Sequence, residues 1–280
     1  MKRIASLLAM ASIIGGGAAM ALTSAAATAA PGASAAANLP TMTVAVTGKT
    51  GIAVSGSTAS GAVSITSTFS GKGQGGYGLV RLDQGVSFPE ALQAVQSHHG
   101  DPNALTPFGA IVVSADAPST VQTNLTPGNY VALNLTGNGP APSVAQFTIT
   151  PSSSPAALPA AAATETSIEF GFKGPKVLHD GTMVRVENGG FLVHMDSLIG
   201  ARNKADAQKI MALLKAGKDN KAQKLATGFV DLMNPASPGA MQQEVLNAKP
   251  GYYVQACFMD TQDGREHTTL GMERVIRIAK

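Results

Sequence analysis

The sequence predicts an all-β protein built of two tandem β-sandwiches, each with a short helical insertion. Two observations indicate this fold: short runs of alternating branched and polar residues recur along the chain, and the same order of elements occurs twice. Composition agrees, because Gly is abundant at 31 residues, aromatic residues make up only 5% and Trp is absent. Such a composition is typical of short strands joined by turns.

Residues 1–30 predict a secretory signal peptide. Lys2 and Arg3 precede an apolar stretch, and small residues at 26–30 suit cleavage. We therefore expect a secreted or extracytoplasmic location (periplasm or cell envelope), with no integral membrane segment after cleavage. Loss of these two cations lowers the formal net charge from +3 to +1, so the charge predicts no nucleic-acid partner.

Residues 41–150 are expected to form the first domain. Strands are predicted over 42–48, 61–71, 109–115, 120–125, 129–135 and 145–150. The helical insertion is predicted over 88–99, with Pro89 acceptable in its first turn. Residues 151–166 are rich in Pro, Ala and Ser and nearly uncharged, which predicts an interdomain linker.

Residues 167–280 repeat the pattern and are expected to form the second domain. The answering elements are strands over 167–172, 182–190 and 272–279, a helix over 206–217, and the stretch 244–258, which answers 120–135. The best anchors of this repeat are Pro-Gly pairs that shortly precede Tyr130 in one half and Tyr253 in the other. The repeat predicts a duplicated β-sandwich.

Four side chains in the second half form a candidate metal site. Cys257, His267 and Met272 lie on one stretch between two expected strands, and His194 is the best-placed further imidazole. Thiolate, imidazole and thioether are ligands that copper prefers, and two His, one Cys and a weak axial Met form a blue-copper centre. Cys257 is the sole cysteine, so it makes no internal disulfide. We predict that these residues bind one copper ion.

The second half resembles the cupredoxins, the blue copper or plastocyanin-like proteins. The matching residues are Asn188-Gly189-Gly190 before His194, Pro250-Gly251-Tyr252-Tyr253 before Cys257, and His267 five residues before Met272. More narrowly, the chain looks like secreted bacterial cupredoxin-like proteins, and LVRLDQGVSFPEAL in the first half is similar to the same group. The resemblance implies two tandem cupredoxin-like Greek-key β-sandwiches and a type 1-like copper site for one-electron transfer.

The chain departs from the cupredoxin pattern in two places. Nine residues, 258–266, separate Cys257 from His267, which is more than in plastocyanin-like, azurin-like or nitrite reductase sites. Asp263-Gly264 predicts a turn that folds this excess back. In the first half, aligning the two tyrosines places Asn134 opposite Cys257, so that domain is predicted to lack metal ligands.

Plainer interpretations remain open for each residue. Cys257 can be a buried thiol, His194 a core histidine, His267 a surface residue, and Met272 a packing residue. Ala256 and Phe258 flank the cysteine where multicopper oxidases have histidines, and no nucleophile elbow occurs, so we expect no enzyme. The expected partner is a redox protein in the cell envelope. The alternatives are a metal-free β-sandwich that serves as an interaction or ligand-binding module, and a copper carrier.

Overall fold

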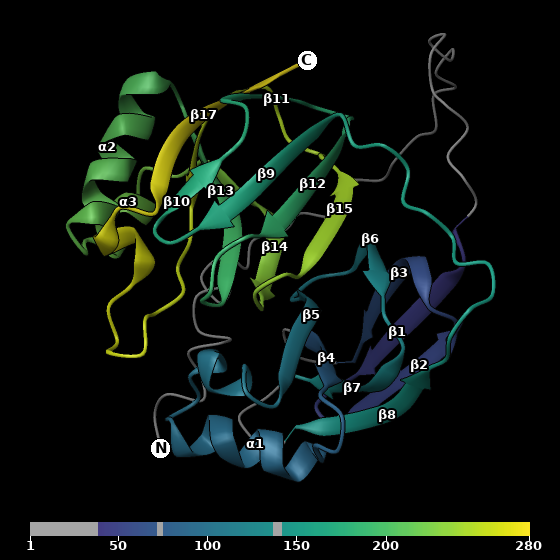
Figure 1. Cartoon of the computed structure of the whole chain (residues 1–280). Helices are drawn as coiled ribbons and strands as arrows, with labels where there is room; N and C mark the ends of the chain where they lie inside the picture. Colours follow the sequence, from purple (N-terminus) through teal and green to yellow (C-terminus); the bar gives the residue numbers. More distant parts are fainter. Residues whose placement is uncertain (1–38, 72–74, 137–141) are drawn as a thin grey trace, which may run out of the picture.

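The structure is a computed structural model that describes residues 39–71, 75–136 and 142–280 (Figure 1). The expected signal peptide, residues 1–30, lies outside the described residues. Strands dominate and the helices are few and short, so the predicted all-β fold class is confirmed. Across the three described segments, no helix is both long and apolar enough to cross a membrane.

The first half is a sandwich of two layers with strand orders β6-β3-β1-β2 and β5-β4-β7-β8. In β1, Met42, Val44 and Val46 are buried whereas the residues between them are not, which is the period-two pattern of a half-buried strand. The elements are β1 (Thr41–Thr47), β2 (Gly51–Gly56), β3 (Gly61–Ser70), β4 (Tyr77–Leu82), α1 (Phe88–Ser97), a 3-10 helix (Pro102–Leu105), β5 (Gly109–Ala115), β6 (Ser119–Leu125), β7 (Gly128–Asn134) and β8 (Ser143–Ile149).

The second half is a sandwich of the layers β10-β9-β12-β15 and β11-β17-β16-β13-β14. Its core lies between these layers and includes Val186, Leu198, Leu232 and Ile276. The elements are β9 (Ala163–Ile168), β10 (Gly171–Lys173), β11 (Val177–His179), β12 (Met183–Asn188), β13 (His194–Ala201), α2 (Lys204–Lys215), α3 (Asp219–Gln223), β14 (Gly228–Ala236), β15 (Met241–Val245), β16 (Gly251–Ala256), a 3-10 helix (His267–Leu270) and β17 (Glu273–Ala279).

The two halves share one topology. In the first layers, β1 pairs parallel with β3 and antiparallel with β2, as β9 does with β12 and β10. In the second layers, the order β5-β4-β7-β8 answers β14-β13-β16-β17, with β11 added at the edge. The Tyr130 hydroxyl donates to the Thr126 carbonyl at 2.9 Å, and Tyr253 donates to Lys249 at 2.7 Å, so both halves have the same tyrosine corner. The predicted repeat is therefore present in the strand order.

Each half carries its helix on the outer face of its second layer (Figure 1). In α2, Ala207, Ile210 and Leu214 are buried and pack against Val254 of β16. The lysines of α2 are exposed, as expected for a solvated helix face. Asn203 caps the helix, because its side chain accepts a hydrogen bond from a backbone N–H in the first turn.

Hydrogen bonds across the junction join the two halves. Gln243 of β15 pairs with Gln122 of β6, so one sheet runs through eight strands. The Ile111 N–H donates to Ser237 Oγ at 2.8 Å, and the Ser237 N–H donates back to the Ile111 carbonyl at 2.9 Å. Because the halves share a sheet, their division into two separate domains at the expected boundaries stays a prediction.

The expected linker, residues 151–166, is partly strand. β9 begins at Ala163, which pairs with Val184 of β12. Earlier in the same stretch, the Ala156 carbonyl accepts a hydrogen bond from the Ala62 N–H at 2.9 Å. The composition predicted an interdomain linker, and these backbone hydrogen bonds to distant residues hold the stretch against the sandwich.

The prediction of one continuous strand over 167–172 is wrong. β9 ends at Ile168, Glu169 and Phe170 form a turn, and β10 begins at Gly171. The Glu169 carboxylate accepts N–H groups from the loop before β13, a contact that residue alternation does not reveal. Further elements were not expected at all, among them β2, β11, β13, α3 and β14.

Candidate metal centre

The first candidate ligand, His194, begins β13 and is fully buried. The loop before it, residues 189–193, is called the His194 loop below. Asn188 shapes this loop, because its Nδ2 donates to the carbonyls of Leu192 and Ala236, both at 2.8 Å. Its Oδ1 accepts the Gly190 N–H at 3.0 Å, which closes a tight turn. The Asn-Gly-Gly motif therefore presents the histidine at the strand end.

The second candidate ligand, Cys257, follows β16 directly and is also fully buried. Its Sγ accepts a hydrogen bond from the Met195 N–H at 3.4 Å. Its backbone N–H donates to the Met272 carbonyl at 3.2 Å. The sulfur thus lies between the start of β13 and the approach to β17, at one end of the second layer.

The nine residues 258–266, called the Cys–His loop below, fold back on themselves. Asp260 and Glu266 form an isolated antiparallel bridge, and the Thr261 N–H donates to the Arg265 carbonyl at 2.8 Å. Gly264 turns the chain with a φ of 79°, as the Asp-Gly pair predicted. The long gap therefore closes into a small hairpin that returns His267 to the cysteine.

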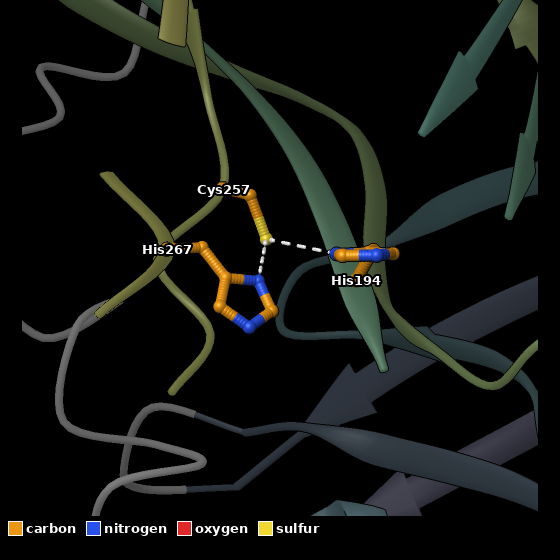
Figure 2. Close-up of side chains that lie close together, drawn as sticks. All are labelled: His194, Cys257 and His267. Carbon is orange, nitrogen blue, oxygen red and sulfur yellow. Dashed lines mark hydrogen bonds between the residues drawn. The ribbon is translucent and has the colours of Figure 1, made fainter. Parts of the chain in front are cut away.

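The structure brings the two imidazoles and the thiol together (Figure 2). Cys257 Sγ lies 3.3 Å from Nδ1 of His267 and 3.8 Å from Nδ1 of His194. One ligand atom from each residue lies within 4.8 Å of the others, and all three side chains are buried. Among the described residues, no other group of three His, Cys, Asp or Glu side chains brings its ligand atoms this close together.

The separations fit a shared metal ion. Imidazole nitrogen and thiolate sulfur bind transition metals at about 2.0 and 2.3 Å, so two such ligands at open angles lie about 3.5 Å apart. The observed distances of 3.3 and 3.8 Å from sulfur to nitrogen bracket that value. The interpretation of His267 as a surface residue is wrong, because its side chain is fully buried against the thiol.

Met272, the fourth predicted ligand, lies in the same buried cluster. This cluster joins Val193, Cys257, Met259 and Met272, with Phe170 packed against it. The Met272 N–H donates to the His267 carbonyl at 3.0 Å. The backbone of Met272 is therefore hydrogen-bonded to both Cys257 and His267. Its role as a metal ligand stays a prediction.

The electrostatics of the site favour neutral side chains in the metal-free protein. Burial raises the pKa of the Cys257 thiol to about 12. Burial, with His194 nearby, lowers the pKa of His267 to about 4, and burial also lowers the pKa of His194. Neutral imidazoles are ready to bind a cation, whereas the thiol must first lose its proton. Metal binding at this site would therefore release one proton.

Glu169, which no sequence pattern indicated, orients His194. Nε2 of His194 lies 3.3 Å from Oε1 of Glu169, which directs Nδ1 toward Cys257. The same carboxylate accepts the backbone N–H groups of Phe191 and Leu192. Partial burial raises the pKa of Glu169, but these donors outweigh burial and hold the pKa below its ordinary value. An ionised carboxylate therefore holds the imidazole at Nε2, on the side opposite to the nitrogen that faces Cys257.

Phe170 covers the other histidine. Its ring packs edge-on against His267, with 5.1 Å between the ring centroids. Nε2 of His267 is buried and has no hydrogen-bond partner within the described part of the chain. The turn between β9 and β10 thus touches both imidazoles, one through a carboxylate and one through an aromatic ring. No local pattern in the sequence indicated this, because the turn lies 24 residues or more before the histidines.

Asn134 occupies the corresponding place in the first half. It ends β7, which answers β16, and it is buried. Its Nδ2 donates to the Gly51 and Gly48 carbonyls at 2.9 and 3.2 Å, and its Oδ1 accepts the Thr136 N–H at 2.8 Å. An amide therefore ties loops together at the position that a thiol occupies in the second half.

Comparisons with known proteins give weak structural similarity only. No family model matches the chain, and no curated protein matches its sequence. A reduced auracyanin from Roseiflexus castenholzii shows 16% identity and a TM-score of 0.27 over 42% of this chain and 95% of that chain. Auracyanin A, a blue copper protein from Chloroflexus aurantiacus, shows 14% identity and a TM-score of 0.24 over 41% of this chain and 99% of that chain. A multicopper oxidase shows 12% identity and a TM-score of 0.24 over 85% and 88%. These values are too low to assign an activity or a family.

Proposed function

We propose that this chain binds one copper ion in a type 1-like site of its second half and transfers single electrons. The ligands would be His194, Cys257 and His267, with Met272 as a weak axial ligand. One observation carries the proposal: two imidazole nitrogens and a thiol sulfur converge in a buried site at distances that fit a shared ion. This donor set is the one that blue-copper sites use.

Copper would supply the one-electron chemistry, and the chain would hold the ion in a fixed environment. Full burial of the three ligands excludes water from the site. Glu169 and the Met195 N–H hold the histidine and the sulfur in place through hydrogen bonds. Ligands that are already oriented in the metal-free fold need to move little when the ion binds.

We also propose a role outside the cytoplasm with a redox partner protein in the cell envelope, and no catalysis of its own. The expected signal peptide motivates the location. Ala256 and Phe258 flank Cys257, so neither neighbour offers an imidazole to a second copper.

A copper carrier would use the same ligands, but it would hold Cu(I) without stable binding of Cu(II).

A copper titration of the metal-free protein tests this function. We expect Cu(II) to produce an intense visible thiolate-to-copper absorption that saturates at one equivalent, because one thiol and two imidazoles surround one position. A matched variant, His98→Ala with His99→Ala, removes two exposed histidines outside the site and should give the same band. A colourless titration without stoichiometric copper in metal analysis would refute the proposal. A site that holds Cu(I) but not Cu(II) would indicate the carrier.

Glu169→Ala is expected to weaken copper binding without removing a ligand. It leaves His194 without its carboxylate partner, and loss of such a support typically costs about 10- to 100-fold in metal affinity. Competition with a chelator of known affinity measures the change. Glu187→Ala removes another partly exposed carboxylate, on β12 of the first layer, and is the matched control that should bind as the unmodified protein does. Equal affinity in Glu169→Ala would show that the carboxylate does not support the site.

A further inference from the structure

One residue of the first half reaches the candidate site. Asn103 lies in the 3-10 helix after α1 and is only 4% exposed. Asp101 caps this helix, and its Oδ1 accepts both the Asn103 N–H at 2.9 Å and Nδ2 at 2.8 Å. Contacts within the first half alone therefore hold the side chain of Asn103 in one orientation.

Asn103 bonds to both loops that carry candidate ligands. Its Oδ1 accepts the backbone N–H of Val193 at 2.7 Å, and Val193 immediately precedes His194. Its Nδ2 donates to the Asp260 carbonyl at 3.3 Å, within the Cys–His loop. In Figure 1, the loop before β17 extends toward the short helical turn that follows α1. One amide thus bridges the His194 loop and the Cys–His loop.

The bridge satisfies a group that water cannot reach. Val193 is fully buried and lies outside any strand, so its N–H has no sheet partner. A buried N–H without an acceptor is costly, which favours the geometry in which Asn103 is in place. The distance between the two loops is therefore determined in part by the first half of the chain.

We propose that Asn103 is a positioning residue through which the first half holds the candidate metal site closed. In this arrangement the first half supplies no ligand. It acts as a clamp on the segments that present His194 and His267, and so limits access to the Cys257 thiol. The effect on copper rests on the proposed function, whereas the effect on thiol access does not.

Alkylation of the metal-free full chain tests the clamp without copper. The chain has a single cysteine, so the mass gain from iodoacetamide reports Cys257 alone. Iodoacetamide reaches the thiol only when the two loops open, and in the unmodified protein this opening breaks the buried hydrogen bond between Val193 and Asn103. Asn103→Ala removes that cost, so we expect the alkylation rate to rise by about fivefold to a hundredfold. Asn124→Ala is the matched control, since Asn124 is an exposed asparagine on β6 of the same half.

Copper-loaded protein gives a second measurement. In Asn103→Ala, we expect the thiolate-to-copper band to shift and the copper affinity to fall about tenfold, because the two ligand loops are no longer held at one separation. Asn124→Ala should reproduce the unmodified spectrum. If the unmodified protein shows no such band, the proposed function fails, while the alkylation result still decides the clamp.

Unchanged alkylation and an unchanged spectrum in a folded Asn103→Ala variant would overturn the clamp. If that variant does not fold, hydrogen exchange of the unmodified protein decides. A slowly exchanging Val193 amide supports the bond to Asn103. An amide that exchanges at the rate of an unstructured peptide overturns it.

Discussion

Cys257→Ser is expected to abolish the thiolate-to-copper absorption and to lower copper affinity by more than about a hundredfold, more than loss of a supporting group costs. A serine hydroxyl keeps its proton and is a hard oxygen donor, whereas copper in this kind of site prefers a soft thiolate. The substitution changes one atom of a buried side chain, so the two imidazoles can remain near their places.

Visible absorption and the melting temperature with and without copper measure this effect. A ligand that binds only the folded state raises stability by mass action, so copper should raise the melting temperature of the unmodified protein but not of Cys257→Ser. Met259→Leu is the matched control, because Met259 is buried in the same cluster and the change conserves volume. Retention of the band in Cys257→Ser would show that another residue binds copper.

Arg274→Ala is expected to cost about 3–5 kcal/mol of unfolding free energy, the largest stability effect we foresee. Glu165 is fully buried and forms an ion pair with the Arg274 guanidinium. Nε of Arg274 also donates to Gln255 Oε1 at 2.6 Å, and Gln255 Nε2 donates to Asp196 Oδ2 at 2.7 Å. Removal of the arginine leaves a buried carboxylate unpaired and breaks this network.

The cost of Arg274→Ala should depend on pH. Burial raises the pKa of Glu165 to about 7 despite the opposing effect of Arg274, so loss of the arginine raises that pKa further. A folded-state pKa above the unfolded value means that stability falls as pH rises through that range. The difference between the variant and the unmodified protein should therefore be larger at pH 8 than at pH 5. At pH 8 the buried Glu165 carboxylate is more fully ionised, and without Arg274 it lowers the unfolding free energy most.

Urea unfolding of the metal-free protein at both pH values measures these free energies. The double variant Glu165→Leu with Arg274→Met is the control, because replacing a buried ion pair by apolar residues of similar size is often nearly neutral. A single-variant cost below about 1 kcal/mol at pH 8 would show that the pair behaves like an exposed salt bridge.

Local patterns predicted most strands well. The strand over 109–115 has the expected bounds, and the helix predicted over 88–99 spans Phe88–Ser97. Residue alternation carries this information because each strand has one face in the core. β14 (Gly228–Ala236) was missed, because it contains a proline and its register with β13 is irregular, so alternation is lost.

Three of the four predicted ligands are found together, and their spacing in the sequence explains why they were recognisable. Cys257 and His267 lie at the two ends of one loop, and an Asp-Gly turn signal marked how that loop closes. His194 was recognisable from the Asn-Gly-Gly motif before it. These residues stand at strand ends and beside short turns, and local sequence patterns mark such places.

The supporting groups depend on contacts that no local pattern reports. Glu169 meets His194 because the β9–β10 turn lies over the end of β13, 25 residues away in sequence. Asn103 meets Val193 across 90 residues and across the junction of the two halves. Residue type and short spacing were enough to predict most of the strands, the repeated order of elements and the candidate donors, because these features are local. The distances between the donors and the groups that cover them depend on how the sandwiches pack, so they follow from the tertiary structure alone.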